Sequence, residues 1–386
     1  MIPYGRQSIS ERDIDAVVRI LRSDFLTQGP AVPAFERKLV QRCRARHAVA
    51  VSNATAALHL ACLALGVGPG DRVWTSPVTF VASANCALYC GAEIDFVDID
   101  PRTYNLSAGH LAEKLEKAER SGQLPKVVIA VHLCGQPADM QEIRRLADRY
   151  GFRIIEDASH AVGASYRGTL VGCGVYSDIT VFSFHPVKII TTAEGGMALT
   201  NDPVLARRME LLRSHGITRE EAEMTEPTHG AWYYQQVALG FNYRMTEMQA
   251  ALGLSQLDRL DEFVERRRVL ATRYDAALAD TGVTRPWQDP AGRSAWHLYV
   301  VRLAPDHGHR MVFERLRVGG IGVNLHYIPV YLQPYYRRLG FQPGYCPEAE
   351  RYYATAISLP LFPDLTESQL DAVVSALRLA LNESAG

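Results

Sequence analysis

The sequence predicts an α/β protein built on a mostly parallel sheet, and three observations lead to this fold class. Short runs rich in β-branched residues alternate with helical patterns from residue 48 to residue 201. After residue 201 the alternation stops and longer helical patterns take over. The length of 386 residues is more than one core usually holds, so we expect roughly two or three domains.

The alternation can be followed element by element. Expected strands and helices succeed one another at residues 47–53 and 54–65, 71–77 and 79–90, 93–100 and 111–120, and 126–135 and 138–151, with a further strand at 153–159. Strand–helix–strand units of this kind place parallel strands side by side and cover both faces with helices.

Two helical patterns follow, at residues 205–216 and 245–280, and the second reads as a connector to another domain. We expect a large α/β domain over residues 1–250 and a smaller α+β domain over residues 251–386, with the first ~25 residues packing on the smaller domain. The polar segment 218–236 is expected to form a long loop, and such loops are often functional.

Charge and hydropathy exclude several classes of partner. The 41 lysines and arginines nearly balance 42 aspartates and glutamates, which leaves a formal charge of −1 and no field that would attract nucleic acid or an acidic membrane. The apolar runs are much shorter than the roughly 20 residues of a membrane-spanning helix. The first residues show no export signal, so we expect a cytoplasmic protein.

The seven cysteines are scattered through apolar segments and form no CxxC pair, so we expect them to be reduced. Cys86 and Cys90 are four residues apart and could share one helix face. No histidine or second cysteine pair lies near them in the sequence, so we expect no metal site.

Ligands of open α/β sheets bind at the carboxyl ends of the strands, and four such ends carry suggestive side chains. After the first strand, Ala54 and Thr55 open a helix whose free N–H groups could bind an anion, although capping by Ser52 or Asn53 explains the same pattern. Phe80 opens the next helix and could offer a flat face to an aromatic ligand, although a place in the core is commoner for phenylalanine.

Asp157 ends an apolar strand, and His160 follows three residues later. A carboxylate there needs a cationic or hydrogen-bonding partner, unless it caps a helix. Ser183 ends another strand, and Lys188 lies beyond it. That lysine is either a solvated surface charge or an amine tuned for Schiff-base chemistry.

An anion-binding turn, an aromatic face, a strand-end carboxylate and a later lysine are together what pyridoxal 5′-phosphate (PLP) requires. The phosphate would take the helix N-terminus, the lysine would hold the aldehyde, and the carboxylate would pair with the pyridinium nitrogen so that the ring acts as an electron sink. One cofactor thus accounts for four separate features of the sequence.

Over nearly its whole length the chain resembles the DegT-type family of sugar aminotransferases. This resemblance implies the aspartate-aminotransferase type of fold (fold type I), with a seven-stranded sheet in the large domain. The motifs that carry it are LTQGP, NATAALHLA, TFVASANC, EDASHAVGA, SFHPVKIITTAEGG, RSHG, GFNYRMTEMQAALGLSQL and HYIPVY.

The resemblance implies a role for each candidate residue. Lys188 forms the Schiff base with PLP, and Asp157 pairs with the pyridinium nitrogen. Phe80 stacks on the ring, and His160 lies beside the ring hydroxyl, where many relatives carry glutamine. The implied phosphate contacts are Ala54, Thr55, Ser183 and, from the neighbouring subunit, Asn242. An active homodimer with composite sites follows from that last contact.

The resemblance also implies the reaction, in which L-glutamate converts PLP to its pyridoxamine phosphate form and that amine converts a keto group on a nucleotide-linked deoxysugar. The motifs look most like those of pseudaminic-acid pathway enzymes, which aminate C4 of a UDP-linked 4-keto-6-deoxy-N-acetylhexosamine and give a UDP-4-amino-4,6-dideoxy sugar. Candidate contacts to the sugar nucleotide are Tyr233, Tyr234, His326 and Tyr327, and ordinary packing explains each of them equally well.

Several alternatives stay open at this point. Sister enzymes act on other 4-keto or 3-keto sugars and share most of the motifs. A dehydratase branch carries histidine in place of the lysine, whereas this chain has Lys188. A non-catalytic regulator would not need Lys188, Asp157 and the phosphate site together. An amino-acid transaminase would need an arginine for the substrate carboxylate, which the sequence does not identify.

Overall fold

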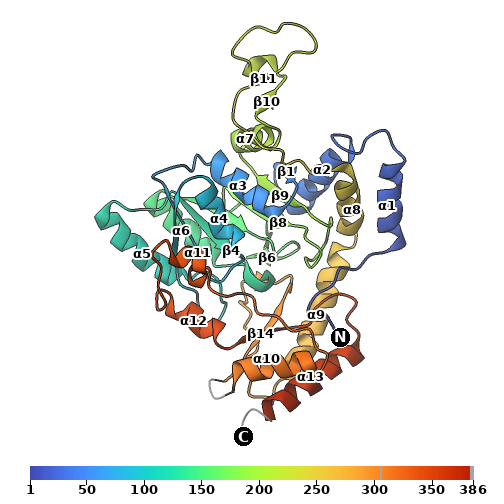
Figure 1. The fold of residues 1–386 in the computed structure, drawn as a ribbon, viewed down its shortest axis with the longest axis vertical. Helices are drawn as coiled ribbons and strands as arrows, with labels where there is room; N and C mark the ends of the chain where they lie inside the picture. Colours follow the sequence, from blue (N-terminus) through green and yellow to red (C-terminus); the bar gives the residue numbers. More distant parts are fainter. Residues whose placement is uncertain (305–306, 383–386) are drawn as a thin grey trace.

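A computed structural model describes residues 1–304 and 307–382, and its centre is one seven-stranded sheet (Figure 1). The strand order is β1-β9-β8-β5-β4-β2-β3, and every strand is parallel to the others except β9, which is antiparallel to both β1 and β8. The strands are β1 His47–Val51, β2 Arg72–Thr75, β3 Glu93–Phe96, β4 Val127–Val131, β5 Arg153–Asp157, β8 Ile179–Ser183 and β9 Gly196–Thr200. The predicted α/β class with a mostly parallel seven-stranded sheet is confirmed.

Helices cover both faces of this sheet. The helices of the sheet region are α1 Glu11–Leu21, α2 Ala31–Cys43, α3 Ala54–Ala64, α4 Ala82–Tyr89, α5 Ala108–Ser121, α6 Met140–Tyr150, α7 Pro203–Arg213 and α8 Glu247–Leu257. Val49 and Val51 belong to the core that contains α3 and α4, whereas Ala50 between them belongs to the core on the opposite face, with α2. Burial on both faces explains why these strands read as continuous apolar runs.

The long helical pattern at 245–280 is two helices, α8 and α9 Leu260–Ala277, rather than one. Thr246 and Gln249 form a capping box that starts α8. At the break between the helices, Gln256 and Arg259 both donate hydrogen bonds to the buried carboxylate of Asp13 in α1. Asp13 therefore ties both sides of the break to α1. α8 packs on α1 and α2, whereas α9 continues into the smaller part of the chain.

That smaller part has its own core, built on the antiparallel pair β13 Tyr299–Arg302 and β14 Ala356–Leu359. The helices of this core are α9, α10 His309–Val318 and α13 Glu367–Asn382, whereas α11 Pro334–Arg337 and α12 Pro347–Tyr353 pack on the core that contains α3 and α4. The start of the chain also pairs here, since Ile2 exchanges backbone hydrogen bonds with Gly320 and Gly322, and Tyr4 O accepts one from Leu361. The division of the chain at residue 250 stays a prediction.

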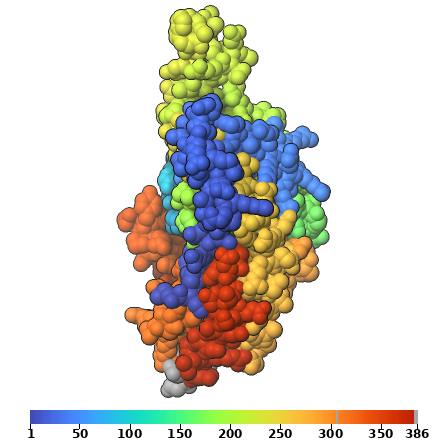
Figure 2. All heavy atoms as spheres, turned by 90° about the vertical axis from the view of Figure 1, so that its right-hand side faces the viewer, coloured from blue at the N-terminus to red at the C-terminus, as the bar shows by residue number. Residues whose placement is uncertain are grey.

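The predicted long loop is an arm that projects from the body, as Figures 1 and 2 show from two directions. Its two sides pair at β10 Ile217–Thr218 and β11 Gln235–Gln236. The remaining short strands are β6 Ser165–Tyr166, β7 Thr169–Leu170 and β12 Gly292–Arg293. Among the described residues, no helix combines the length and the apolar character needed to cross a membrane.

Candidate active site

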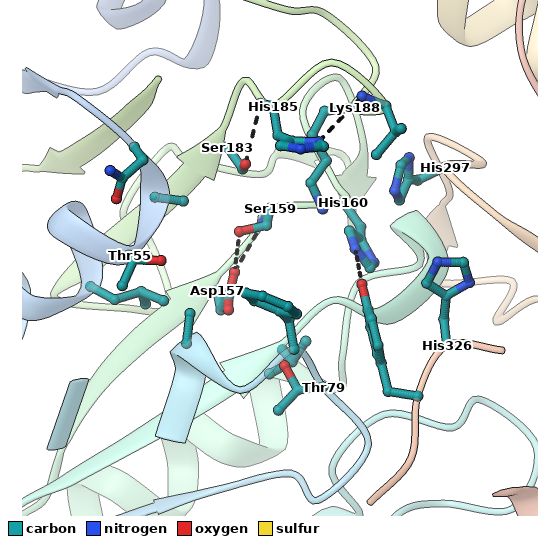
Figure 3. A pocket seen from close by; sticks show the side chains of 18 of the residues that line it. Thr55, Thr79, Asp157, Ser159, His160, Ser183, His185, Lys188, His297 and His326 are labelled. Carbon is teal, nitrogen blue, oxygen red and sulfur yellow. Dashed lines mark hydrogen bonds between the residues drawn. The ribbon is translucent and has the colours of Figure 1, made fainter. Parts of the chain in front are cut away.

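A cavity of about 940 Å³ opens at the carboxyl edge of the parallel strands (Figure 3). Segments far apart in the sequence form its walls: the turns after β1, β5 and β8, the start of α4, and the stretch 324–327. Nine residues that the sequence singled out line it, namely Ala54, Thr55, Phe80, Asp157, His160, Ser183, Lys188, His326 and Tyr327.

The first turn of α3 presents backbone donors to the cavity. Asn53 is the N-cap, and its Oδ1 accepts a hydrogen bond from the Ala56 N–H at 2.8 Å. The N–H groups of Ala54 and Thr55 have no acceptor within the helix and are left for an anion. A Cβ on Gly196 would lie 2.5 Å from the Asn53 carbonyl carbon, so only glycine lets β9 run against this turn.

Asp157 is buried at the end of β5 and is held in one orientation. Its Oδ2 accepts a hydrogen bond from Ser83 Oγ at 2.6 Å, and its Oδ1 accepts two from Ser159, from N–H at 3.1 Å and from Oγ at 2.6 Å. No lysine or arginine of the described residues forms an ion pair with it. A fixed, buried carboxylate without a cation is suited to a protonated ring nitrogen.

Lys188 lies in the loop that joins β8 to β9, half-buried in the wall of the same cavity. Burial lowers the pKa of its amine to about 8, although the charge of Asp157 acts in the opposite direction. A substantial fraction of this amine is therefore neutral near physiological pH and able to act as a nucleophile or base.

Three buried histidines, His160, His297 and His326, lie near Lys188 (Figure 3). Burial lowers the pKa of His160 and of His297 well below the usual range, and that of His326 to about 3, with the Lys188 charge adding to each effect. The cavity therefore holds neutral imidazoles, so that Lys188 is the one cation among its described lining residues.

The hydrogen bonds of His160 define its tautomer. The N–H of Cys134 donates to Nδ1 at 3.3 Å, so the proton of the neutral ring is on Nε2, which faces Tyr327 Oη at 3.2 Å. The turn that supplies the Cys134 N–H needs Gly135, because φ is +95° there and a Cβ would lie 2.9 Å from the His160 carbonyl oxygen.

These residues fit PLP. The α3 turn offers donors for a phosphate, Asp157 offers a fixed carboxylate for the ring nitrogen, and Lys188 offers an amine of lowered pKa for the aldehyde. Phe80 is 59% exposed, so its ring is open to the cavity rather than packed in the core. The features that were ambiguous in the sequence converge on one site.

Three candidates do not reach this cavity in their own chain. Tyr233 and Tyr234 lie on the projecting arm, and neither lines the cavity. Asn242 is exposed, and its backbone pairs with Ser214 at the base of the arm. The contact of Asn242 with a neighbouring subunit stays a prediction.

Two residues that line the cavity, Tyr4 and His297, lie outside the quoted motifs and had no recognisable signal in the sequence. His297 begins a stretch that reads only as a strand, and a single histidine there is more often part of the core. In the structure its ring centroid lies 4.3 Å from that of His160, and its Nδ1 is buried without a hydrogen-bond partner among the described residues.

Comparison with known proteins assigns this chain to a family of aminotransferases. The model of the DegT/DnrJ/EryC1/StrS aminotransferase family matches residues 7–378. The spore coat polysaccharide biosynthesis protein SpsC of Bacillus subtilis is 38% identical over 383 residues, which cover 98% of this chain and 96% of SpsC. The uncharacterized protein MJ1066 of Methanocaldococcus jannaschii is 36% identical over 390 residues, covering 99% of this chain and 98% of that protein.

Solved structures agree with this placement. The putative sugar aminotransferase Spr1654 from Streptococcus pneumoniae, in its PMP-form, has a TM-score of 0.90 at 29% identity, with all of both chains covered. Its PLP-form has a TM-score of 0.89 at 30% identity and covers 99% of each chain. PseC from Helicobacter pylori, an aminotransferase involved in the biosynthesis of pseudoaminic acid, has a TM-score of 0.90 at 28% identity and covers 99% of each chain.

Proposed function

The chain belongs to the DegT/DnrJ/EryC1/StrS aminotransferase family and is a PLP-dependent sugar aminotransferase, and on that premise we propose that it aminates C4 of a UDP-linked 4-keto-6-deoxy-N-acetylhexosamine, with L-glutamate as the amino donor. The product would be a UDP-4-amino-4,6-dideoxy sugar of the kind used for nonulosonates such as pseudaminic acid. We place the reaction in the cytoplasm.

One observation supports this activity most directly: the α3 turn, Asp157 and Lys188 all line the same cavity. Similarity to PseC over 99% of both chains supports the choice of substrate. The presence of Lys188 and Asp157 in a formed cavity argues against a non-catalytic regulator.

Each residue of the site has a task that follows from its geometry. When bound, PLP supplies an electron sink and a temporary carrier for the amino group. The N–H groups of Ala54 and Thr55, with the Ser183 hydroxyl, would bind its phosphate. Asp157, held by Ser83 and Ser159, would keep a proton on the ring nitrogen.

Lys188 moves the proton in this proposal. With a pKa of about 8, its Nζ is neutral often enough to accept a proton from the substrate carbon and charged often enough to return one. His160 would keep its Nε2 proton directed at Tyr327, so that the neighbouring hydroxyl and imidazole hold one arrangement during the reaction. His326 is fixed by Ser358 Oγ at 2.8 Å from its Nδ1 and would contact the sugar.

The proposed function includes a homodimer. Asn242 and the arm tyrosines, Tyr233 and Tyr234, lie outside the cavity of their own chain, and we propose that they complete the site of the partner. A two-fold axis makes such contacts reciprocal, so a mixed dimer of Lys188→Ala and Asn242→Ala chains would hold one site with both defects and one with neither.

Subunit exchange between these two variants tests the composite site. We expect the mixture to regain activity in proportion to the heterodimer fraction, measured by native mass spectrometry. Asn242→Ala mixed with itself serves as the control. If heterodimers form but activity does not return, Asn242 does not act in the partner's site.

The substrate is tested with a panel. The purified PLP-loaded protein is incubated with L-glutamate and with UDP- and dTDP-linked 4-keto and 3-keto sugars, and products are followed by mass spectrometry. We expect the amino product from the UDP-linked 4-keto-6-deoxy-N-acetylhexosamine at the highest kcat/KM. A clear preference for another ketosugar would contradict the proposed substrate, and absence of the glutamate half-reaction would contradict the donor.

A further inference from the structure

Three cysteines gather between α3 and α4, outside the cofactor cavity. Cys62 lies near the end of α3, Cys86 lies in α4, and Cys90 follows the last residue of α4 as its C-cap. All three belong to the core that contains these two helices, and none of them lines the cavity. Cys62 is more than twenty residues from the other two in the sequence, so only the fold brings the three thiols together.

The three thiols differ in their partners and in their exposure. The thiol of Cys62 hydrogen-bonds with those of Cys86 and Cys90. Cys86 also has a partner in its own helix, because its Sγ donates to the Ser83 carbonyl oxygen at 3.4 Å. Cys62 and Cys86 are fully buried, whereas Cys90 is 9% exposed. A small oxidant that arrives from solvent therefore meets Cys90 first, and Cys62 is the thiol beside it.

A histidine from α3 completes the cluster. The imidazole of His59 hydrogen-bonds with Cys90, and its Nδ1 lies 3.2 Å from the Oη of Tyr243, which lines the cofactor cavity. When the Tyr243 hydroxyl donates to Nδ1, the imidazole proton is on Nε2 and is left to donate to the sulfur of Cys90. The ring centroids of Phe241 and Tyr89 lie 4.9 Å and 5.5 Å from that of His59, so aromatic packing holds the imidazole in place.

These contacts favour a thiolate at Cys90. Hydrogen bonds from Cys62 and His59 lower the pKa of Cys90 to about 6, although burial acts in the opposite direction. The C-terminus of α4 also opposes a negative charge at this position, so the two donors supply the stabilisation. Among the described residues, no group of histidine, cysteine, aspartate and glutamate side chains is arranged to hold a metal ion. A thiolate that touches a protonated thiol is instead the arrangement from which a disulfide forms.

We propose that Cys90 is a modification site for hydrogen peroxide and that the oxidised residue forms a reversible disulfide with Cys62. The Cys90 thiolate attacks one peroxide oxygen and the O–O bond breaks, which gives a sulfenic acid and a hydroxide that takes up a proton to become water. The Cys62 sulfur, on losing its proton, attacks the sulfenic sulfur and releases a second water. The two thiols lose two electrons in total, and the peroxide gains them.

The test maps linked peptides. PLP-loaded protein with reduced cysteines is treated with hydrogen peroxide, the remaining thiols are blocked with N-ethylmaleimide, and the digest is read by mass spectrometry without reduction. We expect a Cys62–Cys90 link as the first product, and dithiothreitol should remove it. Cys173 is the internal reference, because it is more exposed than Cys90. At pH 6.5 and without peroxide, N-ethylmaleimide should label Cys90 before Cys173.

Variants separate the contributions of the cluster. Cys90→Ser should give no link, and Cys62→Ala should leave a sulfenic acid on Cys90 that dimedone traps. His59→Phe removes the imidazole donor and should slow the labelling of Cys90 by roughly tenfold, the order of one lost hydrogen bond to a charged group. His59→Gln keeps an N–H donor and should retain most of the rate. Cys173→Ser is the matched control and should leave the yield of the link unchanged.

Three results would overturn the inference. The first is labelling of Cys173 before Cys90 in the wild type, because exposure alone would then decide the order. The second is oxidation of Cys90 with no link to Cys62. The third is a link between Cys62 and Cys86 in equal yield, because the contact between His59 and Cys90 would then select nothing. None of these measurements uses a ketosugar, so their outcome is independent of the proposed substrate.

Discussion

The amine of Lys188 is expected to titrate at a pH far below that of an ordinary lysine, even in the protein without cofactor. Its pKa is lowered to about 8 by burial in the cavity wall, and the negative charge of Asp157 limits the shift. Replacing Asp157 with asparagine removes that charge and leaves the burial. The Asp157→Asn variant should therefore titrate at a still lower pH than the wild type.

The size of the effect follows from the shift. At pH 7.5 an amine with a pKa of about 8 is neutral in about a quarter of the molecules, whereas one with the usual value of about 10.4 is neutral in roughly 0.1%. Only the neutral form attacks an aldehyde or accepts a proton. The cavity thus raises the reactive fraction by roughly two hundredfold at that pH.

Competitive labelling measures this titration directly. Cofactor-free protein is treated with a trace of acetic anhydride at intervals between about pH 6 and pH 11, and the acetylation of each lysine is read by peptide mass spectrometry. Lys117, exposed on α5, is the internal reference. Labelling of Lys188 should reach half its maximum near pH 8. If it rises together with Lys117, the reasoning from burial is refuted.

Three further predictions concern the rest of the site. Gly196→Ala should lower the free energy of unfolding by about 1–3 kcal/mol and weaken PLP binding, because its Cβ would collide with the α3 turn. Gly68→Ala is the control: Gly68 has open space around it, so the denaturation midpoint should not change. Asp157→Asn should lower kcat by roughly 10²–10³-fold with the cofactor still bound, and a loss of only a few-fold would contradict its role. Tyr327→Phe should raise KM for the ketosugar more than it slows the glutamate half-reaction, and equal losses would indicate structural damage.

The sheet could be predicted because its strands are buried on both faces and therefore leave continuous apolar runs in the sequence. Asp157 and Lys188 could be predicted because each places a charged side chain at or after the end of an apolar strand. A charge in such a position needs a partner or a chemical role. The break between α8 and α9 left no comparable signal. It depends on Asp13, more than two hundred residues away in the sequence.

Parts of the cavity wall were also beyond prediction from pattern alone. Tyr4 and His297 reach the site only because the first residues and the segment before β13 fold back on it, and neither carries a periodicity that marks a ligand contact. Local pattern predicts a long loop at the arm but does not specify how its two sides pair, as they do at β10 and β11. The position of Tyr233 and Tyr234 relative to any site therefore depends on assembly rather than on the single chain.

The one antiparallel strand of the seven-stranded sheet, β9, has a consequence for how such an enzyme can change during evolution. β9 returns directly from the lysine loop and runs between β1 and β8, and its first residue, Gly196, lies against the turn after β1 that would bind the phosphate. An insertion in the helices cannot separate these two groups. The reactive centre can therefore stay constant while the loops on the far side of the cavity diverge, and new acceptors can be acquired without rebuilding the chemistry.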